Sequence, residues 1–550
     1  MQNSKLPLKI KKFTSTIILL SIVLIASVLR LYQLGTVPPS PDWDEAALGY
    51  NAYSIMQTGR DEYGKFMPIV LQSFDDYKPA LYMYTIIPFI PVFGVDLVAV
   101  RLPSALFGIL TVLATYFLVF ELFKRKDLAY FSSLLLAISP WHIQFSRVAF
   151  ETNMGLAFNV FGVLFFLKGL KKPWFLLLAA FFLGLNLSVY HSERVFTPLL
   201  VLGLIFIFWK QVFSLPKKFL AASVVIGMLT LLPLISYIAT NNTALSRLKG
   251  VNIFSQKTFI RVEGEKRFLE DKANNNTLGL LFHNKWVWYS REMLGGYLSH
   301  FDLNWLFIQG DLPRHHAPSM GLLYLWELPF LLIGIYGLLF FKLPTKTKIV
   351  IFFWFLLAPF PASVTKDVPH AVRTLNFLPT FQVFIAIGLM TTFHFFRKNH
   401  ESGIMNQGFR LGFYITFFLF TSFNIFFYLN QYFVQQNYFV SQDWQYGYKE
   451  AAAFVTEQGR SYDKIVVSDE VPLDQSYIFF LYYLQYSPSL YQATGDKHHF
   501  DKFEFRKVDW ASEKKQPNIL YIGRPDDFPT GTVLKTIRYL NGEPAIKIVQ

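Results

Sequence analysis

The chain has 550 residues, of which 53% are hydrophobic, 18% aromatic and only 16% charged. A soluble protein of this length would carry about a quarter charged residues, so the composition excludes an ordinary soluble globular protein. The absence of cysteine excludes disulfides and thiolate chemistry, and the net charge of +14 gathers in short loops rather than in a nucleic-acid-binding patch.

Long apolar runs with almost no charge are the clearest feature of the sequence. A Lys, Arg or Asp at the centre of a membrane helix costs about 2.5–3.5 kcal/mol on insertion scales, so such runs predict membrane-spanning helices. The first run is too long for a signal-peptide core and no small-residue cleavage site follows it, which predicts an uncleaved span. We predict about eleven spans, near 13–32, 101–123, 128–141, 152–167, 174–189, 198–213, 219–239, 321–341, 348–361, 375–396 and 409–430.

The basic residues between these runs predict how the chain crosses the membrane. The N-terminal lysines, Lys5 to Lys12, place the N-terminus in the cytoplasm by the positive-inside rule. Residues 79–94 are apolar but short and rich in proline; if they crossed, every later basic loop would lie outside. We therefore predict that 79–94 forms a juxtamembrane helix lying flat in the interface. The clusters that then lie inside are 124–126, 168–172, 210–218, 342–348 and 397–410.

This topology describes a multi-pass protein of the inner (plasma) membrane with its C-terminal part outside the cytoplasm. The segments predicted to lie outside are 33–100, 142–151, 190–197, 240–320, 362–374 and everything after 431. They hold nearly all of the carboxylate, histidine and aromatic clusters, so we expect the chemistry on that side.

The first external loop carries the densest set of polar residues. Asp42, Asp44 and Glu45 precede a run of helical period, a pattern in which an acidic residue can also simply cap the helix. The loop then returns through Asp75-Asp76-Tyr77-Lys78-Pro79-Ala80-Leu81-Tyr82. A carboxylate can serve as a general base and a lysine can neutralise phosphate, although Lys78 could instead anchor the chain at the interface.

These motifs resemble a known superfamily. The loop with Asp44-Glu45, the Tyr77-Lys78-Pro79 turn and the following Arg101-Leu102-Pro103-Ser104-Ala105-Leu106-Phe107-Gly108 are similar to the lipid-linked-sugar glycosyltransferases of the GT-C superfamily. The branch they resemble most contains protein O-mannosyltransferases and bacterial lipid A aminoarabinose transferases. The likeness is strongest over 38–200, and Ala80 departs from it where many relatives have a second proline.

The resemblance implies a polytopic α-helical fold of the GT-C type and a polyprenyl- or dolichyl-phosphate sugar donor. It also implies an active site outside the cytoplasm and inversion at the anomeric carbon. It assigns the base to Asp44 or Glu45, with Asp44 preferred, and we expect Asp76, Tyr77 and Tyr82 to contact the substrates. The donor already carries a phosphate leaving group, so neither a nucleotide nor another cofactor is predicted.

Further polar residues in the predicted external segments could complete such a site. Arginine pairs bidentately with phosphate, so we expect cationic side chains to hold the donor, with carboxylates to orient them. The alternative is that they are interface anchors and helix-end ion pairs. The predicted phosphate-binding residues are Lys78, Arg147, His191, Arg194, His370 and Arg373, and the predicted orienting residues are Glu151 and Glu193. His370 and Arg373 would share a helix face if the next span began there.

Adjacent His315 and His316 also raise the question of a metal. Neighbouring side chains point apart in most backbones, and no third ligand follows at a motif spacing. A metal site is therefore not indicated, although a divalent cation stays open as an alternative.

After about residue 440 the sequence pattern changes from long apolar runs to short predicted helices and strands. It predicts helices at 448–458 and 476–485, strands at 464–467 and 519–522, and a hairpin over 533–548 around Asn541-Gly542. We predict a small external α/β domain over 431–550, after a transmembrane catalytic domain over 1–430.

Two other classes of protein fit parts of the sequence. A transporter or flippase for lipid-linked sugars predicts charged residues at mid-depth and inverted repeats, and the sequence has neither. A non-catalytic scaffold accounts for the tail but not for the 38–82 loop. We therefore predict a hexosyl- or pentosyltransferase that acts in the lipid bilayer, with protein, lipid A or another glycan as its acceptor.

Overall fold

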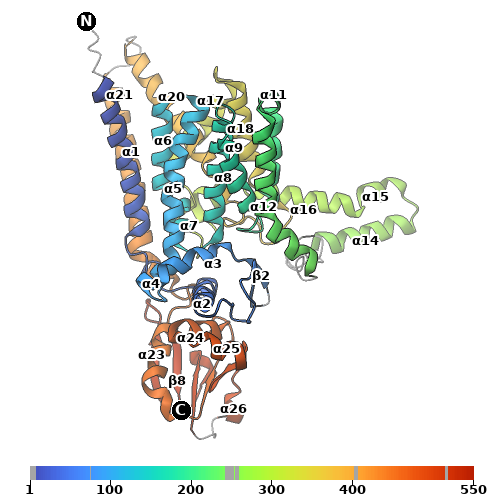
Figure 1. Cartoon of the computed structure of the whole chain (residues 1–550), viewed down its shortest axis with the longest axis vertical. Coiled ribbons are helices and arrows are strands. Elements are labelled where there is room, and N and C mark those ends of the chain that lie inside the picture. The colour runs from blue at the N-terminus through green and yellow to red at the C-terminus, as the bar shows by residue number, and fades with distance from the viewer. Residues whose placement is uncertain (1–7, 75, 242–252, 254–258, 402–406, 514–517) are drawn as a thin grey trace.

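The computed structural model describes residues 8–74, 76–241, 253, 259–401, 407–513 and 518–550. It is an elongated molecule with a bundle of long helices at one end and a sheet region built from the C-terminal residues at the other (Figure 1). A layer of short helices and one hairpin lies between them. We call the bundle end that faces this layer the sheet-side end, and the other the loop-side end.

The bundle has a helix in every range where the sequence predicts a span. These helices are α1 (Leu8–Leu31), α5 (Leu97–Phe123), α6 (Lys126–Ile138), α8 (Glu151–Gly169), α9 (Phe175–Asn186), α10 (Glu193–Ile207), α12 (Lys217–Thr240), α17 (Glu327–Phe340), α18 (Thr345–Leu357), α20 (Thr380–Glu401) and α21 (Gln407–Asn430). Among the described residues, seven helical segments are long and apolar enough to cross a membrane. The chain is therefore a multi-pass membrane protein.

Close helix packing is visible where α17 meets α20. A Cβ atom added to Gly334 would lie 1.7 Å from the carbonyl oxygen of Phe384, and one added to Gly388 would lie 1.9 Å from that of Phe330. Only glycine allows two helix backbones to approach this closely, as is common between membrane helices. On the outside of the bundle, apolar side chains such as Leu24 on α1 are exposed, as a lipid-facing surface requires.

Short segments complete the bundle and its ends. They are α7 (Pro140–Arg147), α11 (Trp209–Phe213), the π-helix η3 (Trp305–Gln309), α19 (Phe360–Ser363), η4 (Leu375–Phe377), the π-helix η5 (Gln431–Gln435) and α22 (Gln436–Val440).

The layer below the bundle is formed by the first long loop. It contains α2 (Trp43–Thr58), the hairpin of β1 (Val70–Ser73) and β2 (Asp76–Pro79), and the segments α3 (Leu81–Ile86), η1 (Ile87–Phe89) and α4 (Ile90–Phe93). The predicted juxtamembrane helix at 79–94 is thus three short segments, because Pro88 and Pro91 remove backbone donors. These segments lie across the sheet-side end of the bundle (Figure 1).

The C-terminal sheet region contains every element that the tail predicts. Its helices are α23 (Tyr448–Gln458), η6 (Gly459–Ser461), α24 (Ser476–Leu484), α25 (Pro488–Thr494), α26 (Trp510–Glu513) and η7 (Pro525–Asp527). Its strands are β3 (Lys464–Val467), β4 (His499–Phe500), β5 (Phe503–Phe505), β6 (Ile519–Gly523), β7 (Val533–Arg538) and β8 (Pro544–Val549), in the order β4-β5-β3-β6-β8-β7. Strand β3 is parallel to β5 and β6, and β7 and β8 form the hairpin predicted around Asn541-Gly542.

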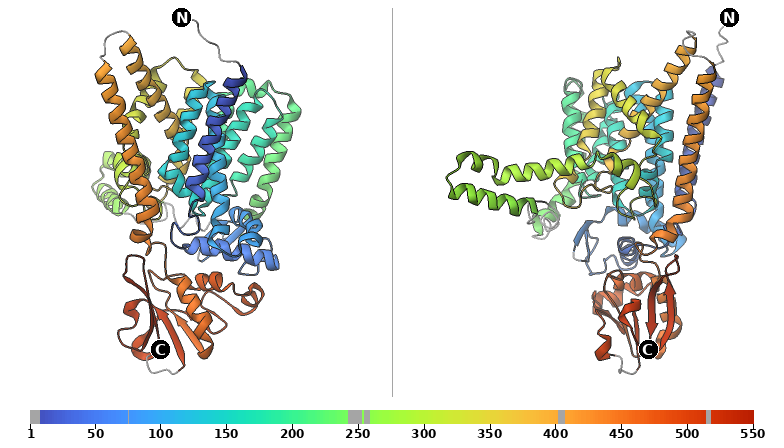
Figure 2. Two further views of the ribbon diagram at one scale, coloured as in Figure 1. Left: turned by 90° about the vertical axis from the view of Figure 1, so that its left-hand side faces the viewer. Right: turned by 180° about the vertical axis from the view of Figure 1, so that it is seen from behind.

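A helical arm projects sideways from the bundle between α12 and α17. It consists of α14 (Phe259–Ala273), α15 (Thr277–Phe282) and α16 (Lys285–Ser299). The right-hand view of Figure 2 shows that the arm extends well beyond the bundle. The sequence predicts only a long external loop here.

Candidate active site

The first turn of α2 presents three carboxylates in different environments. Asp42 caps the helix, because its Oδ1 accepts a hydrogen bond from the Glu45 backbone N–H at 2.8 Å. Its Oδ2 accepts one from Arg314 at 2.8 Å, and the Arg314 guanidinium stacks over the Trp43 ring at 4.4 Å. Burial raises the pKa of Asp42 to about 6, against the opposing effect of Arg314. Asp42 therefore holds the start of the helix in place.

Both carboxylate oxygens of Glu45 accept hydrogen bonds inside the protein. Arg101 donates from Nε to Oε1 at 2.9 Å and from Nη2 to Oε2 at 2.7 Å, and both side chains are almost completely buried. The Ala149 backbone N–H also donates to Oε1, at 2.9 Å. The same guanidinium donates to the carbonyls of Pro38 and Ser40. Glu45 thus joins α2, α5 and the preceding loop, and its oxygens already accept several hydrogen bonds.

Asp44 is the accessible member of the predicted pair. Its side chain is 33% exposed and forms an ion pair with Lys78 of β2, whose side chain is 15% exposed. The pairing joins the two halves of the first loop that the sequence singles out. A carboxylate that is partly exposed beside a lysine can accept a proton from an incoming hydroxyl while the lysine faces an anion.

Two more of the predicted cations lie beside this pair. His191 donates from Nε2 to the backbone carbonyl of Tyr77, the neighbour of Lys78, at 3.1 Å. Arg194 donates from Nη1 to His191 Nδ1 at 3.3 Å and from Nε to the Leu187 carbonyl at 3.2 Å. The structure therefore brings Lys78, His191 and Arg194 together around β2. Asp75 lies outside the described residues, as does the side chain of Asp76, whose backbone pairs with Ser73.

Three other predicted site residues are buried in this structure. Arg147 is buried and donates to the Leu29 carbonyl at 3.0 Å and the Val37 carbonyl at 3.0 Å. Tyr82 is buried and donates to the Val100 carbonyl at 2.9 Å, which fastens α3 to α5. Glu151 is buried in the first turn of α8.

Glu193 is the centre of a buried polar network. Its Oε2 accepts from Asn159 at 2.7 Å and Asn186 at 3.1 Å, and its Oε1 accepts from Asn376 at 2.6 Å. These partners lie on α8, α9 and η4, so Glu193 ties three segments to the start of α10. Like Arg147 and Tyr82, Glu193 is buried within the protein.

A second polar cluster could hold a divalent cation. Asp311, His315 and His370 bring one ligand atom each within 4.8 Å of one another. His315 donates from Nδ1 to Asp311 Oδ2 at 2.8 Å, and the Ala371 N–H donates to the same oxygen at 2.6 Å. Burial would raise the pKa of Asp311, but the hydrogen bonds from His315 and from the Ala371 N–H lower it to about 2. Burial and Arg373 lower the pKa of His370 to about 3. At neutral pH His370 is therefore neutral and Asp311 is ionised, which are the protonation states that bind a metal ion.

The expected shared helix face of His370 and Arg373 is wrong. The chain forms turns here, and α20 begins only at Thr380, just after Pro379, which suits the start of a helix. The two side chains therefore separate: His370 turns to His315, at 5.2 Å between ring centres, while Arg373 donates to Thr365 Oγ1 at 2.8 Å.

Sequence reasoning missed three contributors around α2. Arg314 donates a hydrogen bond to Asp42, 272 residues away in the sequence, and Arg101 enters the sequence prediction only as part of a motif. Gln445 accepts a hydrogen bond from the Trp43 backbone N–H at 3.1 Å and donates to the Asp474 carbonyl at 3.0 Å. The only sequence signal for these contacts is that Arg314 and Gln445 lie in segments predicted on the same side of the membrane as α2, and that Arg101 begins a predicted span next to that side.

Comparison with known proteins agrees with the resemblance seen in the sequence. The family model of dolichyl-phosphate-mannose-protein mannosyltransferases matches residues 20–248. No curated protein sequence matches the chain.

Solved structures share the whole architecture at low sequence identity. The crystal structure of ArnT from Cupriavidus metallidurans in the apo state is similar with a TM-score of 0.55 at 11% identity, over 98% of each chain. The same protein bound to undecaprenyl phosphate gives 0.52 at 10% identity, over 97% of each chain. The archaeal oligosaccharyltransferase AglB from Archaeoglobus fulgidus, in complex with an inhibitory peptide and a dolichol-phosphate, gives 0.53 at 12% identity, over 94% of this chain and 70% of its own. The chain thus has the fold of these membrane enzymes and resembles the GT-C superfamily of glycosyltransferases.

Proposed function

We propose that this protein is a membrane glycosyltransferase that moves a sugar from a polyprenyl-phosphate carrier to an acceptor at the sheet-side end of its helix bundle. The observation that carries this proposal is the pairing of partly exposed Asp44 with Lys78, next to His191 and Arg194. A base for the acceptor and positive charge for the leaving phosphate are thus held on neighbouring segments. These are the two requirements of transfer from a sugar phosphate.

The reaction is a single displacement with inversion. Asp44 takes the proton of the acceptor nucleophile, such as a hydroxyl group, as that atom forms a bond to the anomeric carbon. The bond between this carbon and the phosphate oxygen breaks on the opposite face, and the carrier phosphate leaves with the electron pair. Lys78 and Arg194 stabilise the negative charge that develops on the phosphate, with His191 supporting Arg194.

A lipid-phosphate ligand is consistent with the related structures. One of them is bound to undecaprenyl phosphate, and another is in complex with a dolichol-phosphate and an inhibitory peptide. The family model describes dolichyl-phosphate-mannose-protein mannosyltransferases. We propose the same carrier class here, with either a hexose or a pentose as the transferred sugar.

The orientation in the membrane follows from the basic loops. The positive-inside rule places the loop-side end, with Lys124 to Lys126 and Lys168 to Lys172, in the cytoplasm. The site and the C-terminal sheet region then lie outside the inner membrane. We propose a division at residue 431 between the catalytic membrane part and this external region, which would recognise the acceptor.

The test is sugar release from a radiolabelled polyprenyl-phosphate sugar by the purified protein. Asp44→Asn keeps the size of the side chain but removes the base, so turnover should fall by about 10²–10⁴-fold while donor binding survives. Asp127→Asn, at the loop-side end, is the matched control and should keep its turnover. Equal turnover of Asp44→Asn and wild type would refute the role of Asp44, and loss of turnover in both variants would point to damage unrelated to the site.

A further inference from the structure

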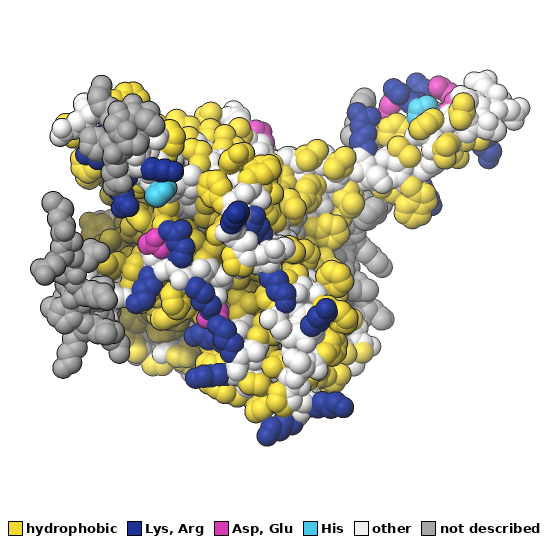
Figure 3. Space-filling model, turned by 90° about the horizontal axis from the view of Figure 1, so that it is seen from above, with side chains coloured by type: hydrophobic (Ala, Val, Ile, Leu, Met, Phe, Trp, Pro, Cys, Tyr) yellow, Lys and Arg dark blue, Asp and Glu magenta, His cyan; other side chains and the backbone are white. Residues whose placement is uncertain are grey.

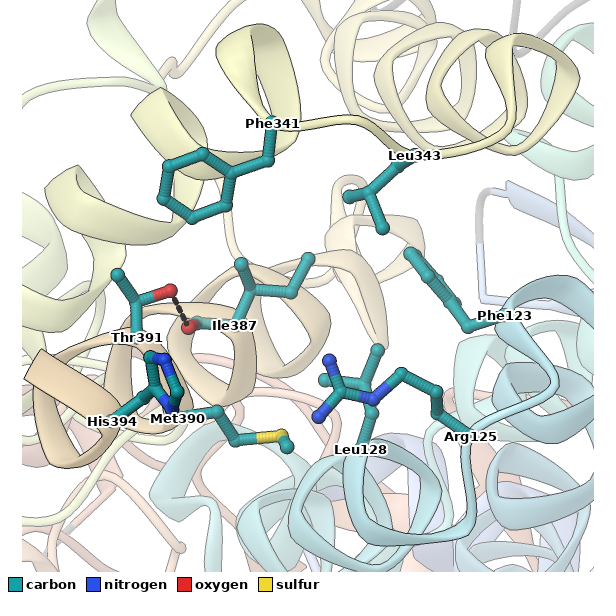
Figure 4. Close-up of a pocket in the computed structure, with 9 residues that line it drawn as sticks. All are labelled: Phe123, Arg125, Leu128, Phe341, Leu343, Ile387, Met390, Thr391 and His394. Atoms are coloured by element: carbon teal, nitrogen blue, oxygen red, sulfur yellow. Dashed lines mark hydrogen bonds between the residues drawn. The ribbon is translucent and has the colours of Figure 1, made fainter. Parts of the chain in front are cut away.

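A cavity of about 420 Å³ lies at the loop-side end of the bundle, far from Asp44 and Lys78. Its walls come from the end of α5, the start of α6, the connection between α17 and α18, and one face of α20. The lining residues are Phe123, Arg125, Leu128, Phe341, Leu343, Ile387, Met390, Thr391 and His394 (Figure 4). The proposed reaction uses none of them.

The lining combines an apolar wall with two basic side chains. In Figure 4, Arg125 extends into the cavity from one side and faces His394 across it, while the remaining wall is almost entirely hydrocarbon. The Thr391 hydroxyl donates to the Ile387 carbonyl at 2.8 Å, so its proton is already committed within α20. A ligand that matches this wall must itself carry both hydrocarbon and negative charge.

Arg125 retains binding capacity although it has a partner. Its Nη2 and Nε donate to the carboxylate of Asp127, at 2.7 Å and 3.2 Å, and both side chains are about half exposed. Exposed pairs of this kind contribute little to stability, so a second anion can share or replace the contact. Arginine has five N–H donors and favours phosphate geometry.

The surroundings of the cavity are strongly basic. Ten basic residues lie at or next to the helix ends on this side: Lys124, Lys126, Lys168, Lys171, Lys172, Lys342, Lys346, Lys348, Arg397 and Lys398. Figure 3 looks down on this end and shows many Lys and Arg side chains among apolar ones, with few acidic side chains. Of the described acidic residues here, Glu121 is paired with Lys124 and Lys171, and Asp127 with Arg125. The local field therefore favours an anion.

The position of the cavity relative to the membrane also limits which ligands can bind in it. Phe123 is the last residue of α5, and α20 continues past the cavity; both belong to segments long and apolar enough to cross a membrane. The cavity thus lies where the hydrocarbon core meets the headgroups. At this depth basic pockets between membrane helices bind the headgroups of anionic lipids.

We propose that this cavity is a binding site for an anionic phospholipid. The lipid phosphate contacts Arg125 and His394, and the first part of an acyl chain packs on Leu128, Leu343 and Met390. The site is separate from the proposed reaction centre and does not depend on the assignment of Asp44. It would fix the loop-side end of α5, α17 and α20 in the leaflet that this end faces.

The test measures lipids retained by the purified, delipidated full-length protein in native mass spectrometry after addition of phosphatidylglycerol or phosphatidylcholine. Wild type should retain one phosphatidylglycerol with at least about fivefold preference over phosphatidylcholine. Arg125→Gln removes the charge and Met390→Trp fills the cavity without changing charge, and each should lower this retention by about fivefold or more.

Lys171→Gln is the matched control, because it removes one charge from the same end without touching the cavity. It should lower retention less than about twofold. Equal losses in Lys171→Gln and Arg125→Gln would overturn the proposal in favour of general attraction to a basic surface. Equal retention of the two lipids, full retention by Met390→Trp, or displacement of the lipid by inorganic phosphate would overturn it as well.

Discussion

The two ends of the helix bundle differ in how deeply they bury their charged side chains. At the sheet-side end, Glu45 and Arg101 are 2% and 0% exposed and share several further hydrogen bonds with the backbone. At the loop-side end, Arg125 and Asp127 are 53% and 51% exposed and contact mainly each other. Buried charges are costly unless they are paired and hydrogen-bonded, so Glu45 and Arg101 are held in fixed positions, whereas Arg125 and Asp127 are not constrained in this way. Fixed positions are what a catalytic site requires.

The largest effect that we predict comes from breaking the buried pair. Arg101→Met leaves Glu45 buried without its partner and should destabilise the protein by about 3–5 kcal/mol. Thermal unfolding in detergent measures this as a large fall in Tm or as loss of folded protein. Adding Glu45→Gln to Arg101→Met removes the stranded charge and should restore part of the loss. An Arg101→Met protein as stable as wild type would contradict the structural role of the pair.

The stability of the protein should depend on pH because of a second buried carboxyl group at the same end, that of Glu62. Burial raises the pKa of Glu62 to about 8, with Asn51 donating to it, so the side chain is neutral in the folded protein at neutral pH. In the unfolded chain its pKa is near 4.5. Folded protein therefore binds more protons between these values, and stability should fall as pH rises from about 5 to 8, by about 2–4 kcal/mol in total.

Glu62→Gln mimics the neutral form and should flatten this part of the curve. Melting temperatures at pH 6 and pH 8.5 measure the difference for wild type and variant. Glu543, an exposed carboxylate of the β7–β8 turn, gives the control Glu543→Gln, which should keep the slope of wild type. The same slope in Glu62→Gln as in wild type would assign the effect to another group.

The contrast between the two ends also marks what the sequence can predict. Apolar runs and basic loops suffice for the helix positions, because membrane insertion depends on local hydrophobicity. Asp44 and Lys78 can be linked because both lie in one loop. The different roles of Asp44 and Glu45 cannot be predicted, since they depend on Arg101 meeting one side chain and not its neighbour.

The site features that the sequence does not predict depend on contacts between residues far apart in the chain. The candidate cation cluster needs His370, which is 55 residues beyond His315 and joins it only through the packing of separate loops. His315 and His316 alone give no such signal. Contacts of this kind are set by tertiary packing, which periodicity and spacing along the chain do not encode.

A medium effect should follow from loosening the C-terminal sheet region from α2. Gln445 is buried and links the Trp43 N–H to the Asp474 carbonyl, so Gln445→Ala removes both hydrogen bonds and should destabilise the protein by about 1–2 kcal/mol. Gln442→Ala is the matched control, because Gln442 is exposed and close in sequence. Denaturant or thermal unfolding compares the two. Equal losses in both variants would mean that the Gln445 side chain does not fasten the region to α2.

The smallest effect should come from the loop-side end, where charge is plentiful. Lys171 pairs with Glu121, but its side chain is 62% exposed and Glu121 also has Lys124 as a partner at 2.8 Å. An exposed pair contributes about 0–1 kcal/mol, and the second lysine compensates for part of that, so Lys171→Gln should change stability by less than about 0.5 kcal/mol. The same unfolding assay measures it at low salt, where surface electrostatics are strongest. A loss as large as that of Arg101→Met would mean that charges at both ends of the bundle are held with equal rigidity. The burial of charges would then not distinguish the candidate site from the loop-side end.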